Sequence, residues 1–279
     1  MKKISLNIFL LLILVVQFKS NAQVDLSNQY KYCKKLFKEE NYYDAITELK
    51  RLKFFDKQNE YGYAANFLIG ESYKMGAKYS DAIIYFTLAE INAGDSLQVY
   101  NSKIQIIRSN ILRKTFGRSL QLLDSLESKE NTGRNEQINY WRGWAYALEN
   151  NWDEAADAWK KVDSAKVLQQ LAQKTEDEKY SVPFVKALSY VFPGAGQLYT
   201  GNYLSGALSM AWNLFAGYLT IKAFVEDRIF DGFVTGNLLW LRFYNGNIQN
   251  AEKFAEQKNL KIANSALLYL QTQFHGTKP

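Results

Sequence analysis

The feature that most constrains this chain is an internal repeat between residues 23 and 165. Small side chains recur at Ala45, Ala82, Ser119 and Ala155, at intervals of 37, 37 and 36 residues. Apolar residues around each of them follow the three-to-four-residue period of a helix. This spacing predicts pairs of antiparallel helices, in which each pair buries its apolar face against the next. The fold class is therefore predicted to be all-α.

Each predicted unit contains a small residue in its first helix and another in its second, so that the two helices can approach closely. The clearer units contain Gly70, Tyr73, Tyr79, Ala82, Phe86 and Ala89, and Gly143, Tyr146, Trp152, Ala155, Trp159 and Val162. The weaker units contain Cys33, Leu36, Tyr42, Ala45, Leu49 and Leu52, and Ser109, Leu112, Phe116, Ser119, Leu123 and Leu126. We interpret Cys33 as a small buried residue. The alternative is an irregular helical bundle that contains the same helices without a repeating arrangement.

This pattern resembles the tetratricopeptide repeat over residues 23–165. The family's usual period is about 34 residues, so the links between units should be slightly longer here. None of the four units has the proline that commonly closes the family's repeat. The resemblance implies a helical-repeat solenoid whose first helices line a groove that binds a protein or peptide partner.

The family's groove positions can be carried over to this sequence residue by residue. They are Lys34, Lys38, Phe67, Glu71, Lys74, Asn110, Arg113, Lys114, Tyr140 and Trp144. Five bases against one acid, with aromatic residues at one end, would suit an acidic segment or a C-terminal carboxylate. The alternative interpretation is that these bases are ordinary solvated side chains on helix surfaces.

The N-terminus has the features of a secretory signal peptide over residues 1–22. Lys2 and Lys3 precede an apolar run from Ile8 to Val16, and small residues around Ala22 precede a predicted cut at Gln23. An uncleaved anchor is the alternative. The net charge of +6 lies in this leader and in residues 181–279, because residues 23–180 carry equal numbers of bases and acids. Bases that flank apolar segments indicate membrane orientation rather than a nucleic-acid-binding face.

The last third of the chain has a different character. Residues 166–180 are charged and rich in Gln, which predicts a polar junction. The apolar run from Val182 to Phe192 is followed by Pro193-Gly194, which should end a helix. Residues 204–225 then contain one charge, Lys222, and are long enough to cross about 30 Å of hydrocarbon.

The segment between these runs carries a second resemblance. Residues 193–201, PGAGQLYTG, resemble the P-G-x-G-Q-x-Y-x-G signature of small bacterial membrane domains. These include the family named for its two transmembrane segments and a related envelope domain of unknown chemistry. The match covers about residues 181–245 and implies a membrane-associated helical hairpin with the motif at its turn. The motif residues carried over are Pro193, Gly194, Gly196, Gln197, Tyr199 and Gly201. A water-soluble helical domain beneath the repeats is the alternative.

A third apolar stretch, residues 230–244, contains Gly232 and Gly236 in a G-x-x-x-G pattern, which allows close helix packing in lipid. A buried helix of a soluble protein is the alternative for this stretch. The acidic and basic residues between 226 and 231 should form an interfacial turn or a polar cluster. Residues 246–279 are predicted to be an amphipathic helix followed by a disordered tail.

The residues that catalysis and metal binding most often need are scarce. The single histidine, His275, lies near the end of the chain, and one cysteine cannot supply a metal site or an internal disulfide. The glycines of residues 193–201 are not followed by the Lys-Ser or Lys-Thr of a phosphate-binding loop. We therefore expect no catalytic residues, cofactor or metal, and no nucleic-acid partner.

The sequence thus predicts a non-enzymatic, exported scaffold or adaptor of the bacterial cell envelope. Its repeats would lie in the periplasm and bind a protein or peptide, while residues 181–245 would contact lipid of the inner membrane. The alternative is a structural assembly subunit whose apolar C-terminal third is the interface within an envelope complex.

Overall fold

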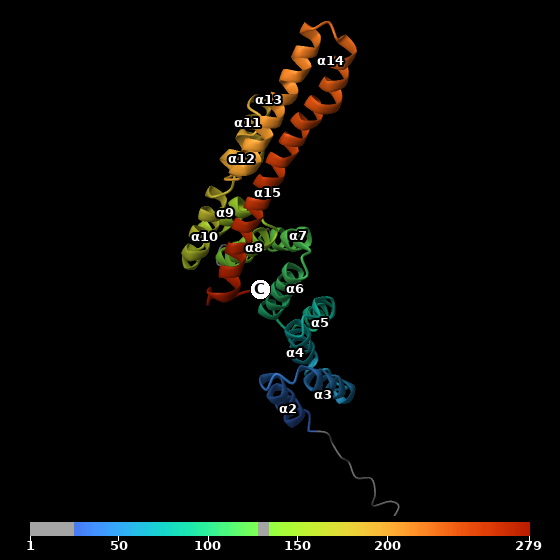
Figure 1. Ribbon diagram of the computed structural model, residues 1–279. Coiled ribbons are helices and arrows are strands. Elements are labelled where there is room, and N and C mark those ends of the chain that lie inside the picture. The colour runs from blue at the N-terminus through green and yellow to red at the C-terminus, as the bar shows by residue number, and fades with distance from the viewer. Residues whose placement is uncertain (1–24, 128–133) are drawn as a thin grey trace, which may run out of the picture. The chain divides into compact units, whose positions relative to one another are not determined.

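The computed structural model describes residues 25–127 and 134–279, and every regular element in these two ranges is a helix (Figure 1). The predicted signal peptide lies outside the described residues. The chain divides into two compact units, of which the first ends at Arg118 and the second begins at Ser119. The division falls inside one helix, α7 (Phe116–Glu127). We describe each unit by itself.

The first unit consists of consecutive helices that pack against one another. They are α2 (Leu26–Lys38), α3 (Tyr42–Phe55), α4 (Gly62–Met75), α5 (Tyr79–Ile91) and α6 (Ser96–Leu112). Asp25 and Asp95 cap α2 and α6 by accepting hydrogen bonds from the backbone amides of Asn28 and Gln98. Cys33 is fully buried among Leu49, Leu52, Ala65 and Ile69, which confirms its predicted packing role.

The turns inside the helix pairs repeat in detail. Glu40, Ala77, Lys114 and Asn150 all have a positive φ between 56° and 69°, at intervals of 37, 37 and 36 residues. After each of them, the next amide donates to the carbonyl five residues earlier, as from Asn41 to Leu36 and from Asn151 to Tyr146. This is the Schellman geometry that ends a helix and reverses the chain. The predicted period is therefore present in the backbone itself.

The small residues of the first helices are needed for close packing, although the partner differs from the prediction. An added Cβ on Gly70 would lie 2.7 Å from the ring of Phe86, and one on Gly143 would lie 2.4 Å from Nε1 of Trp159. The prediction assigned the close approach to the small residue of the second helix, Ala82 or Ala155. The rings of Phe86 and Trp159 from the second helices lie against these glycines instead, because glycine leaves room for them.

The second unit continues the helical packing from the end of α7. Its helices are α8 (Asn135–Leu148), α9 (Trp152–Lys160), η2 (Asp163–Ala165), α10 (Lys166–Asp177), α11 (Val182–Val191), α12 (Ala195–Tyr199), α13 (Tyr203–Val225), α14 (Ile229–Thr235), η3 (Gly236–Trp240) and α15 (Leu241–Thr272). Most of the segment predicted as a polar junction is the helix α10. Its charges lie outward, while Leu168 and Ala172 are buried.

The helix α13 and the segment formed by α14, η3 and the first turns of α15 make an antiparallel hairpin, which we call the apolar hairpin (residues 203–246). Gly232 and Gly236 both face α13, where added Cβ atoms would meet the ring of Phe224 at 2.8 Å and Cγ2 of Thr220 at 3.2 Å. The G-x-x-x-G pattern therefore does bring two helices together.

Within residues 25–127 and 134–279, no helix combines the length and the apolar character needed to cross a membrane. This finding corrects the expectation for residues 204–225. Polar side chains at Ser205, Ser209, Asn213 and Thr220 interrupt the apolar run of α13.

The long helix α15 joins the parts of the second unit (Figure 1). It packs beside α11, α12 and α13, and it also contacts α10. Asn259 accepts a hydrogen bond from the amide of Tyr180 at 2.8 Å and donates one to its carbonyl at 2.9 Å. Lys186 forms an ion pair with Glu252 at 2.9 Å. The two contacts hold the start of α11 against the middle of α15.

Candidate functional site

We call the surface formed by α2, α4 and α6 the first-helix face of the first unit. Its centre is a polar cluster around Lys74, whose side chain is only 7% exposed. The Nζ of Lys74 lies 3.3 Å from a carboxylate oxygen of Glu71 and donates to Oε1 of Gln105 at 2.7 Å. Arg108 donates to the same oxygen at 3.3 Å. Burial lowers the pKa of Lys74, and the positive charge of Arg108 lowers it further, while Glu71 acts in the opposite direction.

The other predicted groove residues of the first two pairs lie apart from this cluster. Lys34 and Lys38 are exposed on α2, and Lys34 lies over the ring of Tyr30 at 5.2 Å. Phe67 packs with its ring 5.5 Å from Tyr63 and 5.5 Å from Phe86, so it belongs to the packing between α4 and α5. The structure thus brings Glu71 and Lys74 together and leaves the lysines of α2 solvated.

In the third pair, the predicted groove residues lie two or three positions after the ones that are equivalent to those of the second pair. Lys114 lies in the αL turn, at the position that Glu40 holds in the first pair, and Arg113 ends α6. Asn110 is buried, and its side chain donates to the carbonyl of Ile106 at 2.8 Å. None of these three positions matches that of Glu71. The equivalent residue, six positions before the turn, is Arg108.

Sequence reasoning therefore missed Arg108 and its neighbour Gln105. A signal for them was present. In the other three units the small residue of the first helix lies nine positions before the start of the second helix, as Gly70 does before Tyr79. Applied to Phe116, that spacing selects Ile107 rather than Ser109. The repeat units were matched by the size of their small residues. This placed the third unit two residues too late, because that unit carries an isoleucine where the others carry Gly or Cys.

In the second unit, the predicted residues Tyr140 and Trp144 of α8 contact the C-terminal end of the chain. The hydroxyl of Tyr140 donates to the carbonyl oxygen of Thr277, and the ring of Trp144 lies 5.9 Å from that of Phe274. Thr277 and Tyr140 both line a cavity of about 390 Å³ that also includes Glu136, Gln137 and Trp141. The expectation of a disordered tail is therefore wrong for residues 274–277.

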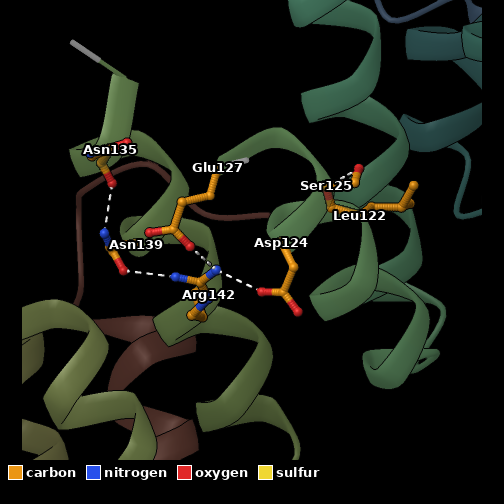
Figure 2. Close-up of polar contacts among 7 residues, drawn as sticks. All are labelled: Leu122, Asp124, Ser125, Glu127, Asn135, Asn139 and Arg142. Atoms are coloured by element: carbon orange, nitrogen blue, oxygen red, sulfur yellow. Dashed lines mark hydrogen bonds and ion pairs between the residues drawn. The ribbon is translucent and has the colours of Figure 1, made fainter. Parts of the chain in front are cut away.

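The surface of α8 that faces α7 is organised by Arg142 (Figure 2). Its Nη2 lies 2.8 Å from Asp124 and 2.8 Å from Glu127, and its Nη1 donates to Oδ1 of Asn139 at 3.1 Å. The hydrogen bond from Arg142 lowers the pKa of Glu127. Burial alone would lower the pKa of Arg142, but the bonds to Glu127 and Asp124 raise it. Arg142 therefore remains positively charged and holds α7 against α8.

The motif of residues 193–201 folds as a tight link with its own short helix, α12. Gly194 has a φ of +97°, and an added Cβ there would lie 2.3 Å from the carbonyl oxygen of Gly206. A Cβ on Gly196 would lie 2.3 Å from Oγ of Ser189 and 2.9 Å from Cβ of Ala251. Glycine is thus required at both positions, because α11, α13 and α15 all approach this backbone closely.

Gln197 is the polar centre of this link. It is fully buried, and its Nε2 donates to the Oδ1 and the carbonyl oxygen of Asn247 at 2.9 and 3.0 Å. Asn247 in turn accepts from the amide of Gly194 at 2.7 Å and donates to the carbonyl of Ser189 at 3.0 Å. The side chain of Asn247 therefore satisfies two backbone groups exposed by the break in the helices, and the motif's Gln holds that side chain in place.

The remaining motif residues lie at the edges of the link. Gly201 has a φ of +75° in the turn before α13, and Pro193 is half-buried after α11. Tyr199 packs its ring 5.5 Å from both Tyr180 and Phe184. The motif joins α11 to α13, as predicted, whereas the tip of the apolar hairpin lies at residues 226–228.

In the ranges that the structure describes, no group of three or more His, Cys, Asp or Glu side chains is arranged to hold a metal ion. Burial raises the pKa of the Cys33 thiol to about 11, so this thiol stays protonated near neutral pH. Comparison with family models, with curated proteins and with solved structures found no match for this chain.

Proposed function

We propose that this protein is a non-enzymatic binding scaffold of the bacterial cell envelope. In this proposal, tetratricopeptide-like helix pairs bind an extended segment of a partner protein, and the apolar hairpin holds the scaffold at a membrane. The observation that carries the proposal is the peptide segment that α8 already binds, namely the chain's own residues 274–277. They lie on the two aromatic residues that the sequence predicted for partner binding.

The contacts of this segment are of a kind that another peptide can make. One is a hydrogen bond to a main-chain carbonyl, which every peptide offers. The other is a contact between two aromatic rings, which selects an aromatic side chain three residues earlier. The indole Nε1 of Trp144 is buried and has no acceptor in the described part of the chain. A bound segment that offers one more carbonyl would satisfy it.

The apolar hairpin supports the second part of the proposal. Most of its exposed side chains are apolar, which is rare for a surface that faces only water. They include Leu204, Leu208, Leu214, Phe215, Tyr218, Ile221, Val225, Ile229, Phe230, Phe233, Leu238 and Leu241. The ion pairs of Lys222, Glu226, Arg228 and Asp231 gather at its tip. We propose that lipid of the inner membrane covers the apolar side chains, with the helix pairs on the periplasmic side.

Peptide binding is tested with a chain that ends at Thr272 and a synthetic peptide of residues 271–279. We expect the shortened chain to bind the peptide and to change the fluorescence of Trp144, and the full chain to bind it more weakly because its own tail competes. Tyr140→Phe should weaken binding about fivefold through the lost hydrogen bond. Tyr146→Phe, a change on the same helix outside the cavity, is the matched control. No binding by the shortened chain would refute the peptide site.

Membrane association is tested by extracting cell membranes with alkaline carbonate and by floating the purified chain with lipid vesicles. We expect the protein to remain with the membranes and to float with vesicles, and Leu214→Glu with Phe233→Glu to abolish flotation. Cross-linking in cells addresses the alternative assembly role. Cross-links to other proteins confined to residues 203–246, together with release by carbonate, would favour an assembly interface over a lipid contact.

A further inference from the structure

A cavity of about 540 Å³ opens between α13 and α15, on one side of the apolar hairpin. Its polar lining is Ser205, Ser209 and Asn213 from α13, and Arg242, Asn247 and Asn250 from α15. The stacked rings of Trp212 and Phe243, with centroids 5.3 Å apart, form one of its apolar walls. A polar cavity in so apolar a surface indicates a ligand with both polar and apolar parts.

Asn213 lines this cavity, and its side chain has an unused acceptor. The residue is 4% exposed, and its Nδ2 donates to the carbonyl of Ser209 at 2.8 Å. Its Oδ1 is buried, and no donor of the described residues reaches it. A buried acceptor without a donor is unfavourable, so a ligand with an N–H or O–H group would gain by binding here.

Arg242 presents an unused cation to the same cavity. It is exposed, and Leu208, Trp212 and Phe243 line the cavity with it. No acidic side chain of the described residues lies within ion-pair distance of it. The acids nearest in sequence pair with other bases, as Asp231 does with Arg228 and Glu252 with Lys186. A guanidinium without an acidic partner, in a cavity with hydrogen-bonding side chains, is well placed for a phosphate group.

We propose that this cavity binds the head group of a phospholipid, with the phosphate on Arg242 and a hydrogen-bond donor of the head group on Oδ1 of Asn213. Leu204 and Leu208 line the same cavity and provide an apolar surface for the acyl chains. The proposal rests on the proposed membrane association of the hairpin.

Two lipids that differ only at the amine separate this proposal from general lipid contact. Phosphatidylethanolamine carries N–H donors, whereas the methylated amine of phosphatidylcholine carries none. The full chain is reconstituted in vesicles that contain the two lipids in equal parts, extracted gently, and examined for retained lipid by native mass spectrometry. We expect phosphatidylethanolamine to be retained over phosphatidylcholine by about tenfold, since the donor is charged.

Two variants assign this preference to the cavity. Asn213→Leu, which keeps the branched shape without the acceptor, should remove the preference, and Arg242→Gln should lower the retention of both lipids about tenfold. Asn237→Leu and Arg228→Gln are matched controls, because both residues lie on the hairpin outside the cavity lining, and they should change neither result. Circular dichroism verifies that each variant remains helical.

The outcomes separate the two proposals. A chain that floats with vesicles but retains both lipids equally, or an unchanged preference in Asn213→Leu, would overturn the head-group site and leave membrane association standing. A chain that does not float with these vesicles would overturn both the head-group site and membrane association. Full displacement of the lipid by glycerophosphoethanolamine, the free head group, would assign the cavity to a water-soluble phosphate ester and overturn the lipid assignment.

Discussion

Replacing Arg142 by Met should detach α7 from α8, because it removes the charge and keeps the length of the side chain. Asp124 and Glu127 are 69% and 43% exposed, so each ion pair contributes at most about 1 kcal/mol after screening by solvent. The third contact lies within α8. Asn139 is 4% exposed, and its Oδ1 would lose its donor, at a cost of about 1 to 2 kcal/mol to the stability of α8 and not to its contact with α7. We expect α7 to open more easily by about 1 to 2 kcal/mol.

The measurement is native-state hydrogen exchange of the amides of α7, combined with urea unfolding followed by tryptophan fluorescence. All six tryptophans lie after residue 118, so fluorescence reports on the second unit alone. Exchange in α7 of Arg142→Met should be faster by roughly five- to thirty-fold. The exchange rate of α7 in Arg142→Lys should lie between those of wild type and Arg142→Met, because an ammonium group cannot reach both carboxylates and Asn139 together.

The pH dependence of this effect follows from Glu127. Its pKa is lower in the folded protein than in the unfolded chain, where it is about 4.3. The ion pair therefore stabilises the fold fully above that value and loses its contribution as the pH falls through the folded pKa. The difference between wild type and Arg142→Met should shrink as the pH falls through the lowered pKa of Glu127. Equal exchange in both proteins at neutral pH, or a difference independent of pH, would refute the role of Arg142.

Three further changes test the packing and the charges. Gly143→Ala should destabilise the second unit by about 1 to 3 kcal/mol in urea, because its Cβ would meet Trp159, whereas Gly246→Ala meets nothing within 4 Å and should be neutral or stabilising. Gly194→Ala should cost about 3 kcal/mol or more through both its φ of +97° and the carbonyl of Gly206, measured in the same way. Burial lowers the pKa of Lys74, so the folded protein loses this proton at a lower pH than the unfolded chain does. The stability of the first unit, measured by circular dichroism, should therefore rise with pH between the two pKa values. The variant Lys74→Met should lack that rise.

The repeat of helix pairs could be predicted from the sequence because small and apolar residues recur with a fixed period. The helix around residues 247–273 could be predicted for the same reason. The register of the third pair could not be found from residue size, since Ile107 holds the position of Gly70 and Gly143. The backbone turn shows the register, because Lys114 adopts the αL conformation there despite its side chain.

Contacts between distant segments were beyond the sequence pattern. Nothing in the order of residues links Tyr140 to Thr277, because that contact depends on the length of α15, which returns the C-terminus to α8. Likewise, the glycines of residues 193–201 predicted a break, but the role of Gln197 depends on Asn247, fifty residues later. Local periodicity determines helices, whereas these contacts depend on how long helices bring remote residues together.

The same turn also occurs where the repeat pattern has ended. Gly201 and Asp227 have φ values of +75° and 56°, and the amides that follow them donate to the carbonyls of Gln197 and Ala223, five residues earlier. The hairpins formed by α12 with α13 and by α13 with α14 are therefore closed in the same way as the helix pairs of the first unit. What changes along the chain is the surface that each hairpin leaves outward. In the helix pairs the next pair covers it, whereas α13 and α14 leave apolar side chains uncovered. The division between the two proposed activities thus follows from side-chain chemistry, because the turns that close the hairpins are the same in both parts of the chain.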